Sequence, residues 1–223
     1  MPEELDSQCE AIIIEYLKKK YGAVAFPIST DDLTCLLERD AQSLDLYADL
    51  SNEEGQVEGV TEFLRGQKPV VKIAAELTEN SNLENRLRTT LTHEYGHVRF
   101  HDFLFQTEEQ SSLSLFEEPG GNPSQTNRCN RDSMLPLSDV DWMEWQAGFV
   151  CGALLIPIGP LIERVRNFRQ THDLDHAALS DRSPEGAALI GEIVKKFQTS
   201  RDAARVRLLQ KRILTLGDMK SLL

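Results

Sequence analysis

The pattern of apolar and polar positions predicts helices at both ends of the chain and a small amount of strand between them. Residues 3–20 carry apolar side chains along one side and predict an amphipathic helix. The polar run at 29–32 is typical of a helix cap and predicts a second helix after it. A strand is expected at 43–48. Residues 57–64 and 69–75 then predict two strands joined as a hairpin by a short loop that contains a glycine.

Two further helices are predicted in the middle of the chain, on either side of a long insertion. In the first, apolar residues recur at helical spacing at Leu83, Leu87, Leu91 and Val98. The second, at 141–157, is apolar for most of its length and ends at a proline, which predicts a largely buried helix. The insertion at 106–140 shows little apolar periodicity, and such segments are usually functional lids or disordered loops.

The first of these helices contains His93-Glu94-Tyr95-Gly96-His97, which is the HExxH pattern. Residues four apart share one face of a helix, so His93 and His97 can both direct an imidazole nitrogen at one metal ion. Glu94 would lie beside that metal, in a position to take a proton from a metal-bound water. The pattern is typical of a zinc peptidase, and the alternative is a surface helix with two unrelated histidines.

A catalytic zinc site needs a third protein ligand. His101 lies roughly 6 Å further along a straight helix than His97, so we expect it to support or pack against the site instead. Glu144 lies in the first turn of the predicted buried helix, where a metal could compensate its charge. Spacing alone leaves open the alternative that Glu144 is an exposed acid favoured by the helix dipole.

Several motifs resemble those of the ImmA/IrrE family of metallopeptidases over about residues 57–160. These motifs are HEYGH, Glu144-Trp145-Gln146-Ala147, the run Ala153-Leu154-Leu155-Ile156-Pro157, and the upstream stretch Pro69-Val70-Val71-Lys72-Ile73. The resemblance implies that His93, His97 and Glu144 bind Zn²⁺ and that Glu94 is the general base.

The resemblance also implies an α+β, zincin-like metallopeptidase domain. Such a domain would have mainly helices, a small sheet or hairpin at the edge of the cleft, and C-terminal helices. We therefore expect one domain over residues 1–223. Its parts would be N-terminal helices in 1–56, a catalytic core in 57–160 with the insertion 106–140, and a C-terminal helical part in 161–223.

Two roles at the site have only candidate residues. An oxyanion stabiliser could be His172, His176 or Tyr95, although packing is the expected role of Tyr95. Cys129 is flanked by two arginines, which favour its thiolate. That thiolate could fill the fourth position of the metal and keep the enzyme latent. The alternative is an exposed cysteine in a loop.

The expected function is limited cleavage of a specific protein by a zinc-dependent metallopeptidase. The resemblance implies that the substrate is a transcriptional repressor, such as a helix-turn-helix protein. An extended substrate segment could pair with the edge of the predicted hairpin at 57–64 and 69–75 by main-chain hydrogen bonds.

The alternative is a DNA-binding or protein-binding regulatory module with a peptidase-like domain. Residues 185–214 predict two helices around 198–200, the second of them basic, which is a pattern similar to a helix-turn-helix. DNA contact would then run through 201–212. The net charge of −12 argues against a chain whose whole surface binds nucleic acid.

Composition predicts a cytoplasmic protein. The four cysteines are widely scattered without a CxxC pair, which suggests reduced thiols. The acidic N-terminus does not have the pattern of a signal peptide. The longest apolar stretch, near 149–162, is interrupted by prolines and too short to span a bilayer, so no membrane partner is expected.

Overall fold

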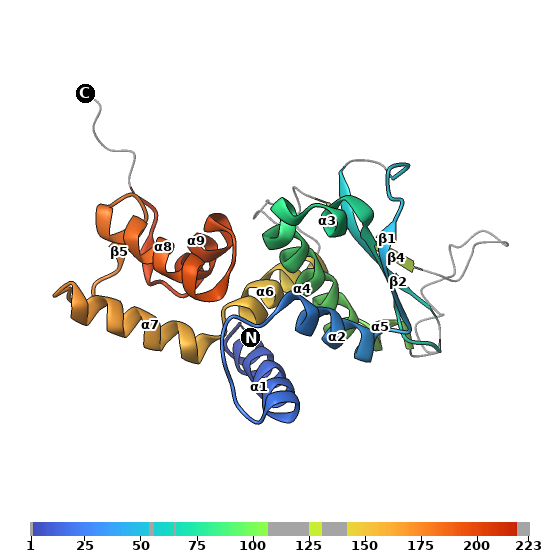
Figure 1. Ribbon diagram of the computed structural model, residues 1–223, viewed down its shortest axis with the longest axis horizontal. Coiled ribbons are helices and arrows are strands. Elements are labelled where there is room, and N and C mark those ends of the chain that lie inside the picture. The colour runs from blue at the N-terminus through green and yellow to red at the C-terminus, as the bar shows by residue number, and fades with distance from the viewer. Residues whose placement is uncertain (1, 54–55, 65, 107–124, 131–141, 218–223) are drawn as a thin grey trace. The chain divides into compact units, whose positions relative to one another are not determined.

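The protein is a mainly helical α+β molecule with a small mixed sheet (Figure 1). The computed structural model describes residues 2–53, 56–64, 66–106, 125–130 and 142–217, with only the backbone described for 125–130. The chain divides into two compact units, one of Ser29–Cys151 and one that joins Met1–Ile28 to Gly152–Leu223. The boundary falls inside the helix that carries Glu144.

The unit of residues 29–151 is built on a four-stranded sheet with the order β1-β3-β2-β4. Its strands are β1 (Ser43–Ala48), β2 (Val57–Phe63), β3 (Val70–Ala74) and β4 (Gln125–Asn130). Strand β1 runs parallel to β3, whereas β2 is antiparallel to both β3 and β4. The predicted hairpin and the strand at 43–48 are confirmed. The insertion contributes a strand that its sequence did not predict, and this strand occupies the edge of β2.

Helices cover the sheet of this unit and carry most of its buried side chains. They are α2 (Thr30–Asp40), α3 (Ala75–Glu79), a 3₁₀ turn at Ser81–Leu83, α4 (Glu84–Phe100), α5 (Phe103–Gln106) and the first part of α6 (Trp142–Leu155). The predicted cap is confirmed, because the Ser29 hydroxyl accepts a hydrogen bond from the Asp32 amide at 3.0 Å. Helix α4 packs against α2 and β2 (Figure 1).

Helix α4 is buried more completely than its apolar periodicity predicts. Every residue from Thr90 to Val98 is buried, including the polar and charged side chains of the HExxH motif. A one-sided amphipathic helix would leave about half of these positions in solvent. Buried polar groups need hydrogen-bonding or charged partners. The two histidines and the glutamate in the second half of α4 must therefore find such partners inside the fold.

The second unit is helical apart from one short strand pair. It contains α1 (Pro2–Tyr21), α7 (Ile158–Thr171), α8 (Pro184–Phe197) and α9 (Arg201–Gln210), with β5 (Leu179–Ser180) parallel to β6 (Leu214–Thr215). The predicted N-terminal helix and the two C-terminal helices are confirmed. Helix α8 ends at Gln198, which has a left-handed backbone with φ of 48°, and α9 begins at the cap residue Ser200.

Within the described part of the chain, no single helix is both long and apolar enough to cross a membrane. Helices α6 and α7 meet that length and composition only when taken together, and a bend of 60° separates them.

Candidate metal centre

Helix α4 places one ring nitrogen from each of two histidines side by side, and α6 places a carboxylate next to both nitrogens. The Nε2 atoms of His93 and His97 lie 3.1 Å apart, one helical turn from each other. The two oxygens of Glu144 lie 3.2 Å from these nitrogens, Oε2 from His93 and Oε1 from His97. Among the described residues this is the one cluster of three or more such side chains that could hold a metal ion.

The spacing of these three ligand groups suits a tetrahedral metal ion. A zinc ion with bonds of about 2.0–2.1 Å holds neighbouring ligand atoms about 3.3 Å apart. The nearest nitrogen–nitrogen and nitrogen–oxygen separations at the site are 3.1 and 3.2 Å. Two imidazoles and one carboxylate leave a fourth position for water or substrate, which is the donor set of a catalytic rather than a structural zinc site. The triad can therefore hold a metal ion.

Small residues let α6 approach α4 closely enough to deliver Glu144. A β-carbon added to Gly96 would come within 3.0 Å of the Ala147 Cα, and Ala147 itself is fully buried. Ala147 follows Glu144 by three residues, so the contact point and the ligand lie on the same side of α6. The glycine inside the HExxH motif thus has a packing role that places the third ligand.

Glu94 is fully buried beside the triad. Only one of its two carboxylate oxygens has a hydrogen-bond partner among the described residues. The Thr61 hydroxyl on β2 donates a hydrogen bond to Glu94 Oε2 at 2.5 Å. Glu94 Oε1 has no hydrogen-bond partner among the described residues. Burial raises the pKa of Glu94, and the neighbouring imidazoles of His97 and His93 offset part of that rise. An unsatisfied buried carboxylate oxygen next to a metal site is suited to accept a proton from water.

Strand β2 approaches Glu94 so closely that a side chain would not fit. A β-carbon added to Gly59 would come within 2.5 Å of Glu94 Oε1. Gly59 and Thr61 alternate with Val60 along the strand, so they lie on the same face of the sheet. Together these two residues form the wall against which the Glu94 carboxylate rests.

The charge of Glu144 is stabilised by the two histidines. Burial by itself opposes ionisation, but hydrogen bonds and charge interactions with His93 and His97 outweigh it and lower the pKa of Glu144 to about 2. Glu144 is therefore the ionised carboxylate that a metal ligand must be. The exposed acid at the start of a helix that spacing alone left open is not what the fold forms, because the Glu144 side chain is only 17% exposed.

His101 lies outside the triad, in the supporting role that its distance along the helix predicted. Its Nδ1 is 2.9 Å from Nδ1 of His97, and its Nε2 is 2.8 Å from Oε1 of Gln146. The ring is fully buried and meets the edge of Trp142, with centroids 5.3 Å apart. Gln146 belongs to the motif that suggested Glu144, but nothing in the sequence assigned it this contact.

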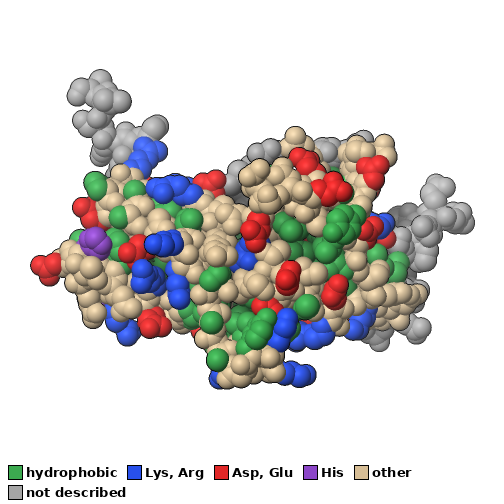
Figure 2. Space-filling view, viewed as in Figure 1, with side chains coloured by type: hydrophobic (Ala, Val, Ile, Leu, Met, Phe, Trp, Pro, Cys, Tyr) green, Lys and Arg blue, Asp and Glu red, His purple; other side chains and the backbone are tan. Residues whose placement is uncertain are grey.

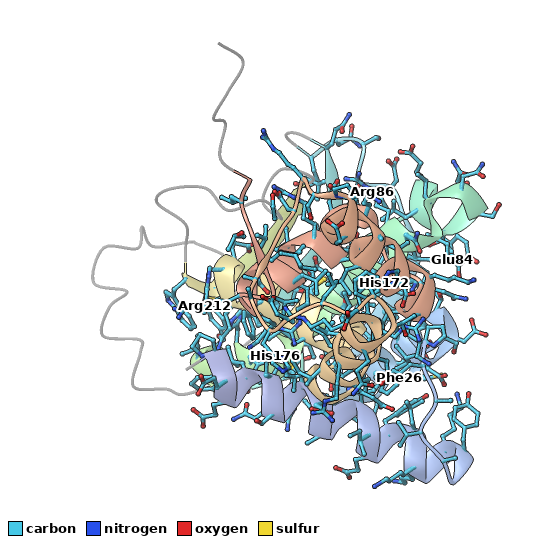
Figure 3. The ribbon with its side chains drawn as sticks, turned by 90° about the vertical axis from the view of Figure 1, so that its left-hand side faces the viewer. Phe26, Glu84, Arg86, His172, His176 and Arg212 are labelled. Carbon is cyan, nitrogen blue, oxygen red and sulfur yellow. The ribbon has the colours of Figure 1, made fainter. Side chains whose placement is uncertain are left out.

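Of the three candidate oxyanion stabilisers, one belongs to the same unit as the triad and two belong to the other unit. Tyr95 is buried, and its hydroxyl donates a hydrogen bond to Asp40 Oδ2 at 2.8 Å at the end of α2. His172, at the end of α7, packs on Phe168 with ring centroids 4.3 Å apart. His172 and His176, which are labelled in Figure 3, both belong to the unit that does not contain the triad. For Tyr95 the geometry favours packing, as expected.

Cys129 lies on β4, where its side chain is outside the described part of the structure. The backbone register places it opposite Gly59, the residue that contacts Glu94. None of the other three cysteines, Cys9, Cys35 and Cys151, forms a disulfide in the described part of the chain. Residues 107–124 and 131–141 of the insertion also lie outside the description.

A pocket of about 500 Å³ lies elsewhere in the same unit and is lined by none of the triad residues. It is formed by the ends of β1 and β2, by α3 and by the start of α4, where Arg86 pairs with Glu58. Volume alone would direct attention to this pocket, but the convergent ligand atoms lie at the triad.

Two arginines of the basic helix α9 form ion pairs with other residues of the same unit. Arg207 is 1% exposed and donates a hydrogen bond to Asp6 of α1, and Arg205 pairs with Asp181. Over this unit Figure 2 shows Lys and Arg side chains interspersed with Asp and Glu. Arg205 and Arg207, two of the basic residues that suggested DNA contact through 201–212, therefore contribute to packing and to ion pairs within the unit.

Comparison of the chain with protein-family models gave no match, and comparison with curated proteins gave none either. The function proposed for this protein therefore depends on the residues of the site itself.

Sequence reasoning missed three residues of the site, namely Gly59, Thr61 and Gln146. Gly59 and Thr61 lie in the predicted hairpin, where a glycine in the middle of a strand is a known sign of close backbone approach. The glycine therefore indicated that some other residue lies close to this strand, but it does not identify that residue.

Proposed function

We propose that this protein is a zinc-dependent metallopeptidase of the ImmA/IrrE type with a zincin-like fold. His93, His97 and Glu144 would hold the zinc, and Glu94 would be the general base. The observation that carries the proposal is the convergence of two Nε2 atoms and two carboxylate oxygens within 3.1–3.2 Å, beside a buried glutamate with an unsatisfied oxygen. A protein that only bound a metal ion would have no need for the Glu94 carboxylate beside the three ligand groups.

The chemistry divides between the metal and the chain. Zinc, when bound, lowers the pKa of its water towards neutrality and polarises the scissile carbonyl. Glu94 Oε1 accepts the proton of the attacking water and later passes it to the leaving amine. Thr61 holds the other oxygen, so Oε1 is the one presented for transfer. The raised pKa of Glu94 makes it a stronger base than an exposed carboxylate.

The proposed substrate is a specific protein that is cut at one or a few sites, such as a helix-turn-helix transcriptional repressor. The hairpin edge that we expected to receive an extended substrate segment is already paired with β4. A substrate strand would therefore add to the outer edge of β4 or take its place. Either route would restrict which substrate segments can reach the site, in agreement with limited cleavage.

The experiment is to compare cells that express the parent with cells that express Glu94→Gln. New protein N-termini are identified by mass spectrometry of terminal peptides. The parent should generate a small set of new termini that the variant does not, while both proteins carry zinc. Identical sets of termini in the two cultures would contradict the proposed cleavage.

A further inference from the structure

The pocket of about 500 Å³ shares two elements with the candidate metal centre. Its wall includes Glu58, which directly precedes Gly59 on β2, the residue that closely approaches the Glu94 carboxylate. The wall also includes Arg86, seven residues before His93 on α4. Seven residues make two helical turns, or about 10 Å along the helix axis. The pocket therefore lies on the same strand and helix as the metal centre, about two turns away.

Part of the pocket wall is apolar and comes from β1, β2, β3 and α3. Ala48, Leu50 and Val57 are buried in one hydrophobic cluster, against which Ala74 packs. Leu77 of α3 lines the pocket too and is also buried. Ligand pockets generally enclose about 300–1,000 Å³. A cavity of this size and lining can therefore hold one long side chain by its aliphatic part.

Carboxylates outnumber cations around this apolar wall. The acids that line the pocket are Asp49, Glu58 and Glu76. Arg86, the one basic residue in the described lining, already pairs with Glu58. Asp49 and Glu76 are both exposed, and no ion pair joins either of them to a described residue. A cation that entered the pocket would therefore find two carboxylates that have no cationic partner within the described part of the chain.

The unit that holds the pocket is acidic as a whole. Residues 29–151 contain about two thirds of the 36 acidic residues of the chain but little more than a third of its 24 basic residues. The negative charge of this unit alone thus exceeds the net charge of −12 of the whole chain. A field of this sign attracts cationic segments and repels anionic ones.

We propose that this pocket binds a basic side chain, Lys or Arg, of the protein substrate. Such a side chain has an aliphatic stem that can pack against Leu50, Val57 and Leu77. Its cationic head can pair with Asp49 or Glu76. An extended chain rises about 3.3 Å per residue, so the two helical turns correspond to about three or four residues of substrate. The basic side chain thus lies about that far from the bond that is cut. This position rests on the proposed peptidase function, whereas the binding itself does not.

Binding is tested by NMR of full-length Glu94→Gln, with two capped alanine-rich peptides that differ at one position, where one has lysine and the other norleucine. Norleucine keeps the aliphatic stem and lacks the ammonium group. At millimolar concentration the lysine peptide should shift the backbone amides of Leu50 and Leu77, and this effect should weaken as salt is added. The norleucine peptide should bind at least about threefold more weakly. Equal binding of the two peptides, or no shift of these amides by the lysine peptide, would overturn the inference.

A pair of double variants tests whether the pocket itself provides this selectivity. Asp49→Asn with Glu76→Gln should weaken binding of the lysine peptide at least about threefold and leave binding of the norleucine peptide unchanged. Asp31→Asn with Glu38→Gln makes the same change of charge at exposed positions on α2 and is the matched control. Equal weakening by both double variants would assign the effect to the general charge of the unit and would overturn the inference.

The position of the basic side chain is tested on the new protein termini from cells that express the parent. Lys and Arg should be enriched about three or four residues from the cut. The enrichment should disappear in Asp49→Asn with Glu76→Gln, which should keep its zinc. Cleavage without such enrichment would overturn the inference and leave the proposed function intact. Selective binding of the lysine peptide by a protein that cuts nothing would support the pocket and contradict the proposed function.

Discussion

Gly96 of α4 lies against Ala147 of α6 so closely that a β-carbon on Gly96 would come within 3.0 Å of the Ala147 Cα. In the sequence, Gly96 lies between His93 and His97, and Ala147 lies one helical turn after Glu144. Two helices can supply ligands to one small ion only if their backbones approach at the ligand positions. The fourth position of the HExxH motif, Gly96, is therefore as much a packing site as a spacer.

Gly96→Ala tests this relationship. The added methyl group should push α6 away from α4, move Glu144 off the two histidines and weaken zinc binding by at least tenfold. The matched control is Gly148→Ala on α6, where an added β-carbon meets no atom within 4 Å. Zinc affinity measured for both variants should fall only in the first. Equal affinities would show that the helix approach does not determine the site.

Gly59→Ala tests the wall behind Glu94, the proposed general base. A β-carbon at this position would stand 2.5 Å from Glu94 Oε1 and would force the carboxylate to move. We expect this variant to keep its zinc and to lose most of its cleavage, because the ligands are untouched and only the base is displaced. Zinc content and the appearance of new protein termini are measured together. Full cleavage by Gly59→Ala would mean that Glu94 does not act from this position.

Tyr95 provides a pH-dependent test of the contact between α4 and α2. Burial and the hydrogen bond to Asp40 raise the pKa of Tyr95 above its ordinary value of about 10. A group whose pKa is raised by folding contributes stability below its unfolded pKa and loses it as the pH rises towards its folded pKa. The free energy of unfolding of the parent should therefore fall more steeply than that of Tyr95→Phe above pH about 10.

Urea unfolding of both proteins between pH about 9 and 11 measures the difference. Subtracting the two curves removes the titration of all other groups, since they are common to both proteins. Parallel curves across this range would contradict the raised pKa. A parent curve that rises relative to the variant would contradict the sign of the effect.

Local features of the sequence predicted most helices, the hairpin and the capped start of α2, because each depends on neighbours a few residues away. The pairing of His93 with His97 is also local, since helix geometry alone brings residues four apart together. The role of Glu144, in contrast, could not be predicted from its neighbours in the sequence. Spacing left a metal ligand and an exposed acid equally open, and the choice depended on how α6 meets α4.

Contacts between distant segments could not be predicted. Thr61 approaches Glu94 across 33 positions of sequence, and Gln146 approaches His101 across 45. Strand β4 has no apolar alternation in its sequence, so its strand form depends on pairing with β2 rather than on its own pattern. The complete burial of α4 likewise comes from the elements around it.

The zinc content and coordination of the purified protein test the central claim most directly. Elemental analysis should find one zinc per chain in the parent and very little in His93→Ala, His97→Ala or Glu144→Ala, because two protein ligands rarely retain a catalytic zinc. X-ray absorption of the parent should show only nitrogen and oxygen neighbours. A sulfur neighbour at about 2.3 Å would instead identify Cys129 as the fourth ligand of a latent form. Full zinc occupancy in Glu144→Ala, or a parent that binds no zinc, would contradict the site described by His93, His97 and Glu144.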